Sequence, residues 1–326
     1  MDILIYEHIL GGGCNENPSP AILNEAKLIV RSLVDDFTRE YPDSKISLLT
    51  NKKNKNILSN ISLVFIDHSA SLIFNIVSNI KKNDKVLILA PEENEIMYKI
   101  VKDLESEKIS LINCSSDFIY KTTYKVLTNN NLINSNKYII KIYSSYKNID
   151  KNQSIVAKSN DGLGAEKLFI FKNREDLENN EKKLLEKHIF QEYIIGDVVG
   201  INIISSFDKI NILSVNKQVY KKNSKNEIFL EKIIFGEFNN MIDIFKIFVR
   251  NILGNFSGFY GFIGIDAIMT NDKKILFLEI NPRLTTSYIG LHKTLGFNPI
   301  KLLYKQDYNY DVKDNKVFSV DITNDK

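Results

Sequence analysis

The stretch FLEINPRLTTSYIG, residues 277–290, places a carboxylate, an amide and a guanidinium at every second position, as Glu279, Asn281 and Arg283. Because a strand sends alternate side chains to opposite faces, we expect these three groups to share one face while Leu278 and Ile280 face a core. Three polar groups on one strand face require a charged ligand or solvent beside them.

A second apolar run, residues 261–270, precedes this strand and is separated from it by the turn sequence NDKK. A hairpin centred on this turn places Asp266 directly opposite Glu279, with Asn281 two residues along on the same face. Two carboxylates and an amide oxygen are hard ligands that suit Mg²⁺ or Mn²⁺ and leave positions open for phosphate oxygens. The alternative is a solvated face neutralised by Lys273 and Lys274.

The order of these residues resembles the end of the ATP-grasp fold, in which an aspartate is followed by an ExN segment and then by PR. The resemblance implies a carboxylate–amine ligase that holds ATP and a divalent metal between two α+β subdomains. By this resemblance Asp266, Glu279 and Asn281 bind the metal, and Arg283 contacts an acyl phosphate as it forms.

Three upstream segments resemble the phosphate-binding parts of the same family. The strand IVAKS carries Lys158 and precedes a loop with Gly162 and Gly164, whose backbone amides can approach phosphate closely. YKVLT places Lys125 at a phosphate, and SVNKQVY places Lys217 near the terminal phosphate as a catalytic cation. Any one of these lysines could instead be a surface charge, so the order of the set carries the interpretation.

The segment IFQEYIIGD resembles the family's adenine hinge. By that resemblance Gln191, Glu192 and Ile194 line the adenine, and Asp197 binds the ribose. The family's ribose carboxylate often lies two residues after the glycine, where this chain has Val198.

A narrower resemblance covers most of the chain. The segments YEHILGGG, APEENEIMYKI, NCSSDFI and NPRLTTSYIGL are similar to those of the archaeal tyramine–glutamate ligases of methanofuran biosynthesis, which join the γ-carboxylate of glutamate to the amine of tyramine. The implied substrate pocket lies between the lobes, where an acid suits an ammonium and Arg283 suits a carboxylate. Its residues are Glu7, Gly12, Gly13, Glu92, Thr285, Thr286 and Ser287.

Other interpretations stay open. Glu92 follows a proline in the first turn of an expected helix, where an acid also complements the helix dipole. The glycines 11–13 are expected to form a flexible loop over a substrate. The whole chain could be an ATP-grasp ligase for another amino acid and amine pair, or a nucleotide-binding regulator without turnover.

The elements that must position these residues differ between the two halves of the chain. In residues 1–116 the β-branched runs ILIYEH, SLVFIDH, KVLILAP and SLINCS alternate with helical stretches, which predicts an α/β domain around a parallel sheet. Closely spaced strand runs and one helix predict an α+β second half. The family resemblance divides that half into a small subdomain, 117–190, and a large subdomain with the metal hairpin, 191–326.

Composition limits the partners. The 326 residues carry 43 basic and 40 acidic side chains, a net charge of +3, which gives no reason to expect nucleic-acid or membrane binding. No apolar run approaches the roughly 20 residues of a membrane span, and no signal peptide is evident, so we expect a cytoplasmic protein with small-molecule partners. Two cysteines, Cys14 and Cys114, are too few for a disulfide framework. Their roles, those of the four histidines, and whether the protein is a homo-oligomer stay open.

Overall fold

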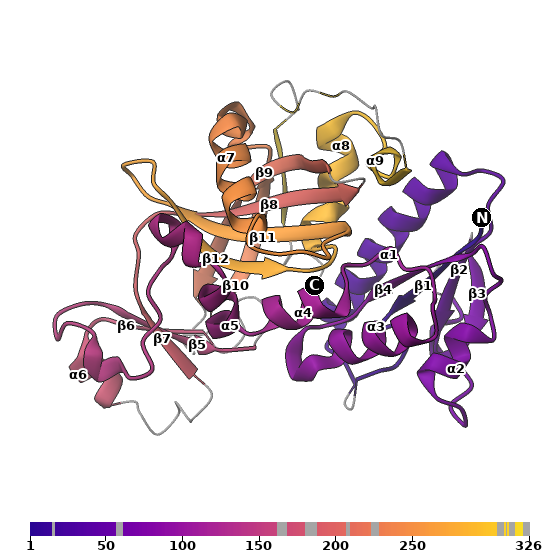
Figure 1. Cartoon of the computed structure of the whole chain (residues 1–326), viewed down its shortest axis with the longest axis horizontal. Helices are drawn as coiled ribbons and strands as arrows, with labels where there is room; N and C mark the ends of the chain where they lie inside the picture. Colours follow the sequence, from indigo (N-terminus) through magenta and orange to yellow (C-terminus); the bar gives the residue numbers. More distant parts are fainter. Residues whose placement is uncertain are drawn as a thin grey trace.

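The computed structural model describes residues 1–14, 17–56, 61–161, 168–179, 188–206, 209–222, 228–304, 310, 312 and 317–321. Three β-sheets form the frame of the molecule. Figure 1 shows a four-stranded sheet at one end, a three-stranded sheet at the other and a six-stranded sheet between them. In the described ranges, no helix has both the length and the apolar character of a membrane span.

The first sheet is parallel, as predicted, with the strand order β3-β2-β1-β4. Its strands are β1 (Ile3–Glu7), β2 (Ile46–Thr50), β3 (Ser62–Phe65) and β4 (Lys85–Leu89). Its helices are α1 (Pro20–Glu40), α2 (Leu72–Val77) and α3 (Ile96–Ser106). The hydroxyl of Ser19 accepts a hydrogen bond from the Ile22 amide, so α1 begins where a capping serine before a proline places it.

One predicted strand of this lobe is wrong. In the run SLINCS, residues 110–115, only Leu111 forms an isolated bridge, to Val86. The reason is that the Asn113 side chain takes the place of backbone pairing, since its amide accepts from the Ile88 N–H at 2.9 Å and donates to the Ile88 carbonyl at 2.8 Å. Cys114 beside it is buried, as expected of a small apolar residue.

The second half begins with helices α4 (Ser116–Thr123) and α5 (Lys125–Asn131). They lead into an antiparallel sheet of order β6-β5-β7, made of β5 (Ile155–Ser159), β6 (Phe169–Phe171) and β7 (His188–Glu192), with α6 (Arg174–Glu178) beside it. The predicted division between residues 190 and 191 falls inside β7.

The large sheet is antiparallel, with the order β12-β11-β8-β9-β10-β13. Its strands are β8 (Asp197–Ser206), β9 (Lys209–Lys222), β10 (Ile228–Phe235), β11 (Gly261–Met269), β12 (Ile275–Asn281) and β13 (Phe318–Asp321). Helix α7 (Ile242–Leu253) covers one face, where Phe248 and Ile252 share a buried core with Ile201 and Ile265. The opposite face is therefore the one on which polar side chains can gather.

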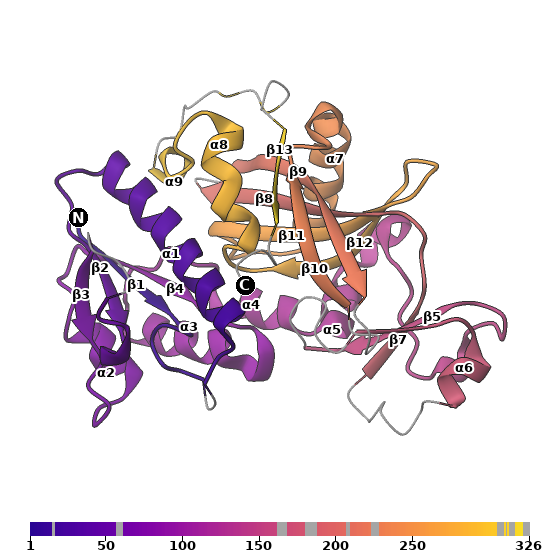
Figure 2. The same cartoon turned by 180° about the vertical axis from the view of Figure 1, so that it is seen from behind.

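A short segment after the hairpin connects the lobes. It consists of the 3₁₀ helix η7 (Thr286–Gly290), α8 (Leu291–Leu295) and α9 (Lys301–Tyr304). Leu284 and Leu291 share a buried cluster with Leu33 and Phe37 of α1. Figure 2 shows α1 running beside α8.

Candidate active site

The β11–β12 hairpin pairs the residues that the sequence predicts. Asp266 lies directly opposite Glu279, and Gly264 lies opposite Asn281. Nearer the turn, however, the register is shifted by one, because a bulge in β12 adds a residue between the two parts of the ladder. The predicted pairing is confirmed at the two carboxylates, although the hairpin is not regular along its length.

The bulge changes the place of Leu278. Since Ala267 pairs with Phe277 and Asp266 with Glu279, Leu278 is the extra residue. It lines the same cavity as Glu279, so the prediction that Leu278 faces the core is wrong. Ile280 is buried in the core as predicted, and Phe277 takes the place expected for Leu278.

Two amides hold the Asp266 carboxylate. Asn281 Nδ2 donates to Oδ2 at 2.9 Å, and Gln218 Nε2 donates to Oδ1 at 3.0 Å. Removal from water and the neighbouring charge of Glu279 both raise the pKa of Asp266, whereas the two hydrogen bonds lower it. Asp266 therefore lies in a site where a cation would relieve the repulsion between two carboxylates.

Two buried lysines supply part of that positive charge. Lys125, at the start of α5, places Nζ 3.2 Å from Oε2 of Glu279. Burial, and then the charge of Lys125, lower the pKa of Lys158 on β5 to about 8. The acid pair opposes these lowering effects. Lysines and carboxylates thus compensate one another in this region.

The donor set fits Mg²⁺ or Mn²⁺. Mg²⁺ is usually held by one or two carboxylates together with phosphate oxygens and water, and Asp266 and Glu279 provide two facing carboxylates. The Asn281 side chain uses its Nδ2 on Asp266, so its oxygen is the atom suited to a cation. Within the ranges that the structure describes, no three His, Cys, Asp or Glu side chains form a metal-like group.

A cavity of about 340 Å³ lies against this charged group. Its size is within the range of small-molecule pockets, roughly 300–1,000 Å³. Apolar side chains from the three-stranded and six-stranded sheets, and from segments beside them, form much of its wall. They include Ile140, Val156, Leu168, Ile170, Ile194, Val198, Ile268 and Leu278. The charged and polar part of its lining includes Lys158, Gln218, Asp266 and Glu279. An apolar slot beside lysines and an acid pair suits a planar base that carries phosphates.

The structure brings the three predicted hinge residues to this cavity. Gln191, Glu192 and Ile194 all line it. Gln191 Nε2 donates to the Ile140 carbonyl at 3.0 Å, and the Tyr143 hydroxyl donates to Glu192 at 2.9 Å. The hinge side chains are thus held by the chain that precedes β5.

Lys125 and Asn281 reach the cavity only through their contacts with Glu279 and Asp266, whereas Lys217 and Asp197 turn away from it. Lys217 Nζ lies 2.7 Å from Oδ1 of Asp197, and neither residue lines the cavity, whereas their neighbours Gln218 and Val198 do. Alternation along β8 and β9 explains the difference, because adjacent residues on a strand face opposite sides. The roles of Lys217 and Asp197 stay predictions. Gly162 and Gly164 lie outside the described residues.

Sequence reasoning missed Gln218 and Tyr220. Both line the cavity, and the Tyr220 hydroxyl donates to Oε1 of Gln218 at 3.1 Å. Gln218 directly follows Lys217, the charged residue of this segment, and Tyr220 lies two residues further along the same strand. Only the strand order, with β8 between β9 and β11, brings them near Asp266.

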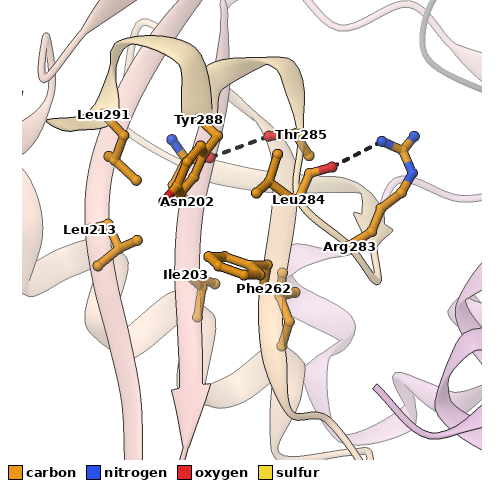
Figure 3. A pocket seen from close by; sticks show the side chains of 10 residues that line it. Asn202, Ile203, Leu213, Phe262, Arg283, Leu284, Thr285, Tyr288 and Leu291 are labelled. Atoms are coloured by element: carbon orange, nitrogen blue, oxygen red, sulfur yellow. Dashed lines mark hydrogen bonds between the residues drawn. The ribbon is translucent and has the colours of Figure 1, made fainter. Parts of the chain in front are cut away.

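A second polar cluster lies where the first lobe meets the hairpin. Arg283 makes a two-pronged contact with Glu92, with Nε 3.0 Å from Oε1 and Nη2 3.2 Å from Oε2. Arg283 Nη1 also donates to the Leu284 carbonyl at 3.1 Å (Figure 3). The guanidinium, predicted to contact an acyl phosphate, is therefore anchored by an acid of the other lobe.

Glu7 belongs to the same region. It ends β1, and Glu92 follows the end of β4, which pairs with β1 in parallel, so both acids lie at the carboxyl edge of the sheet. Glu7 is buried and accepts a hydrogen bond from the Leu10 amide at 2.7 Å. Burial raises the pKa of Glu7 to about 7, against the lowering effect of Arg283. The carboxyl ends of parallel strands are where α/β sheets bind ligands.

The three hydroxyls after Arg283 contact two residues that sequence reasoning missed. Thr285 and Ser287 donate to Oδ1 of Asn202 at 3.3 and 2.6 Å, and the first of these bonds is drawn in Figure 3. Thr286 donates to Glu25 of α1. A cavity of about 10 Å³ beside Asn202 has room for about one water molecule. The hydroxyls thus hold the loop against both lobes.

The predicted glycines of the first lobe form a turn. The Gly12 amide donates to the Ile9 carbonyl at 3.1 Å and the Gly13 amide to the His8 carbonyl at 2.9 Å. Gly12 has a φ of +78°, and a Cβ on Gly13 would collide with the His8 ring. The backbone is hydrogen-bonded at these positions, where a flexible loop was expected.

Comparison with known proteins agrees with this architecture. Residues 119–287 match the family model described as ATP-grasp domain. The chain is 27% identical over 332 residues to a tyramine–L-glutamate ligase of Methanocaldococcus jannaschii, covering 98% of this chain and 94% of that protein. A tyramine–L-glutamate ligase of Methanocaldococcus fervens is 26% identical and covers 89% of each chain. The crystal structure of an ATP-grasp superfamily protein from Archaeoglobus fulgidus superposes with a TM-score of 0.71 at 16% identity, covering 98% of this chain and 99% of that one.

Proposed function

Because the chain belongs to the ATP-grasp family, we propose that it is an ATP-dependent ligase that joins the γ-carboxylate of L-glutamate to the amine of tyramine. One observation carries the ligase chemistry: Asp266 and Glu279 face each other beside Lys125 and Lys158, at the wall of a cavity of nucleotide size. The choice of substrates rests on the two tyramine–L-glutamate ligases, which align over nearly the whole chain.

The proposed reaction has two steps. The γ-phosphoryl group of ATP is transferred to the glutamate carboxylate, which gives an acyl phosphate and ADP. The amine of tyramine then attacks the acyl carbon, inorganic phosphate leaves with the C–O bond electrons, and the ammonium proton is lost to solvent or a base. The products are γ-glutamyltyramine, ADP and phosphate.

The work of the protein in this scheme is positioning and charge neutralisation. Lys125 and Lys158 would neutralise the phosphates, and the apolar wall with Gln191, Glu192 and Ile194 would hold the adenine. Asp266, Glu279 and Asn281 would hold Mg²⁺ or Mn²⁺, which supplies positive charge to the phosphate oxygens when bound.

The inter-lobe cluster would hold the two substrates. Arg283 suits the glutamate carboxylate or its acyl phosphate, and Glu92 keeps the guanidinium in a single orientation. Glu7 suits an ammonium, because it is a buried acid at the carboxyl edge of the parallel sheet. Gly12, Gly13 and the 285–287 hydroxyls would shape the pocket around them.

ADP release tests the proposal. We expect ADP and phosphate to form when ATP, Mg²⁺, glutamate and tyramine are all present, and not when either substrate is omitted, because an amine must intercept the acyl phosphate. Mass spectrometry and fragmentation should identify a γ-glutamyl amide. Faster turnover with another acid or amine would favour a different substrate pair, and ATP binding without turnover across a substrate panel would favour a regulator.

A further inference from the structure

We propose that Gln218 is a positioning residue that presents the Asp266 carboxylate to the cation, an inference that rests on the proposed nucleotide and metal site. Gln218 lies on β9 and Asp266 on β11, with β8 between them. Gln218 Nε2 nevertheless reaches Oδ1 of Asp266 at 3.0 Å, across the intervening strand.

Gly200 makes this reach possible. It lies on β8, paired with Asp266 on one side and with Asn216 of β9 on the other. A Cβ at this position would lie 2.6 Å from Nε2 of Gln218 and 3.5 Å from Oδ1 of Asp266. The φ of Gly200 is outside the left-handed region, so the requirement is for space above the strand and not for an unusual backbone conformation.

Tyr220 orients the amide. Its hydroxyl donates to Oε1 of Gln218 at 3.1 Å, so the NH₂ group is the end that faces Asp266. Asn281 donates to the other carboxylate oxygen, Oδ2, at 2.9 Å. Each oxygen of Asp266 accepts one amide hydrogen bond and retains a second lone pair, so the carboxylate is fixed without being neutralised.

The neutrality of Gln218 distinguishes it from the lysines of the site. Lys125 contacts Glu279 with a full positive charge. A neutral amide can orient a carboxylate and leave its negative charge available to a divalent cation. Loss of such an outer partner typically costs roughly 10–100-fold in metal affinity. A purely structural role would instead affect stability and leave metal affinity unchanged.

The experiment compares Mn²⁺ binding, followed by the electron paramagnetic resonance of free Mn²⁺ with ADP present, in three variants. We expect Gln218→Leu to weaken Mn²⁺ binding by roughly 10–100-fold. Gln153→Leu, a matched change in the turn before β5, should leave it at the parental value. Parental Mn²⁺ affinity in Gln218→Leu would overturn the inference, provided that Asp266→Ala loses binding. Undiminished binding by Asp266→Ala would overturn the metal site itself.

A double-mutant cycle tests the role of Gly200. We expect Gly200→Ala alone to weaken Mn²⁺ binding about as much as Gln218→Leu, because the added methyl group displaces the amide. Combined with Gln218→Leu, the same change should add little, since no amide remains to be displaced. If the losses of Mn²⁺ affinity from the two changes add in full, the proposal that the Gln218 side chain passes over Gly200 is overturned. Thermal melting of each variant identifies one that has failed to fold.

Discussion

At the scale of single residues, the notable feature is the mutual compensation of Asp266, Glu279, Lys125 and Lys158. The two lysines are buried. Lys125 contacts Glu279 directly, and the charges of Glu279 and Asp266 raise the pKa of Lys158 through space, against the lowering effect of burial. Buried charges are tolerated when they are paired, and removing one partner leaves the other uncompensated. The lysines of this site can therefore contact an anion while its carboxylates contact a cation.

Glu279→Ala tests the acid pair. We expect turnover to fall by roughly 100-fold or more, because the variant loses a carboxylate of the pair and Lys125 loses its partner. The protein should stay folded, since Phe277 and Ile280 keep their core contacts on the other face of β12. ADP release and circular dichroism melting measure the two effects, with exposed Glu175→Ala as the control. Near-parental turnover would contradict the hairpin assignment.

The pH dependence of ATP binding tests Lys158. Its pKa is lowered to about 8 by burial and by Lys125, and in its proposed role beside the phosphates of ATP Lys158 must carry its proton. Below pH 7 Lys158 stays protonated, so its titration should not make ATP affinity depend on pH. As the pH rises through about 8, Lys158 of the free protein loses its proton. ATP binding must then be accompanied by uptake of one proton, so the affinity for ATP should fall by at most roughly tenfold per pH unit.

Calorimetric titration with ATP from pH 7 to 9.5 measures this slope and the proton uptake. Lys158→Ala should bind ATP more weakly at pH 7 and lack this component of the slope. An identical slope in the variant would assign the titration to another group.

At the scale of elements, the loop before β11 sets the start of α4, and α5 with Lys125 follows. The Gly258 carbonyl accepts the Ser115 amide at 2.7 Å, and the Ser115 hydroxyl caps α4 by accepting from Phe118 at 3.2 Å. Gly258 has a φ of +77°, and a Cβ there would collide with the Ser115 hydroxyl. The loop before β11, which is far from Lys125 in the sequence, thus helps to place this lysine.

Two glycine substitutions separate strain from collision. Gly296 also has a positive φ, +69°, but no heavy atom lies within 4 Å of its Cβ position. We expect Gly296→Ala to cost about 1 kcal/mol of unfolding free energy from backbone strain alone. Gly258→Ala should cost roughly 2–3 kcal/mol, because the cap of α4 is also disturbed. Urea denaturation measures both, and equal losses would contradict the capping argument.

At the scale of the whole molecule, a buried contact joins the first lobe to the segment after the hairpin. Asp36 of α1 accepts a hydrogen bond from the Tyr288 hydroxyl at 2.8 Å, and its backbone carbonyl accepts from Asn298 at 2.6 Å. Burial raises the pKa of Asp36, whereas the Tyr288 hydrogen bond lowers it. Together with the Arg283–Glu92 ion pair, this contact fixes the lobes that would enclose the substrates.

Tyr288→Phe tests this junction. Removing the hydroxyl leaves a buried carboxylate short of a donor, which should cost roughly 1–3 kcal/mol of unfolding free energy. Tyr304→Phe is the matched control, because in the described part of the chain its buried hydroxyl has no hydrogen-bond partner, and the change should be near neutral. Urea denaturation of both variants, with ADP release as a second readout, gives the comparison. Equal stability of the two variants would contradict a role for the Tyr288 hydroxyl.

The sequence by itself determined the elements and the chemistry that depends on local pattern. The turn position and strand spacing predicted Asp266 opposite Glu279, a pairing that the structure reaches through the bulge at Leu278, and alternating strand and helix runs were enough for the parallel sheet. Ser19 before Pro20 is a local capping signal at the start of α1. The helix start and the hairpin are set by residues close in the chain, and the parallel sheet is indicated by the local alternation of strand and helix runs, which is why these features can be read from spacing.

Tertiary structure alone decided which distant side chains meet. The reach of Gln218 over Gly200 to Asp266, and the contacts of Asn202 and Glu25 with the 285–287 loop, depend on strand order and lobe packing. The bulge at Leu278 and the turn of Lys217 toward Asp197 likewise depend on how neighbouring strands pair. A one-residue difference in strand register exchanges the two faces of a sheet, so residue type and spacing do not determine which of two adjacent residues lines a cavity.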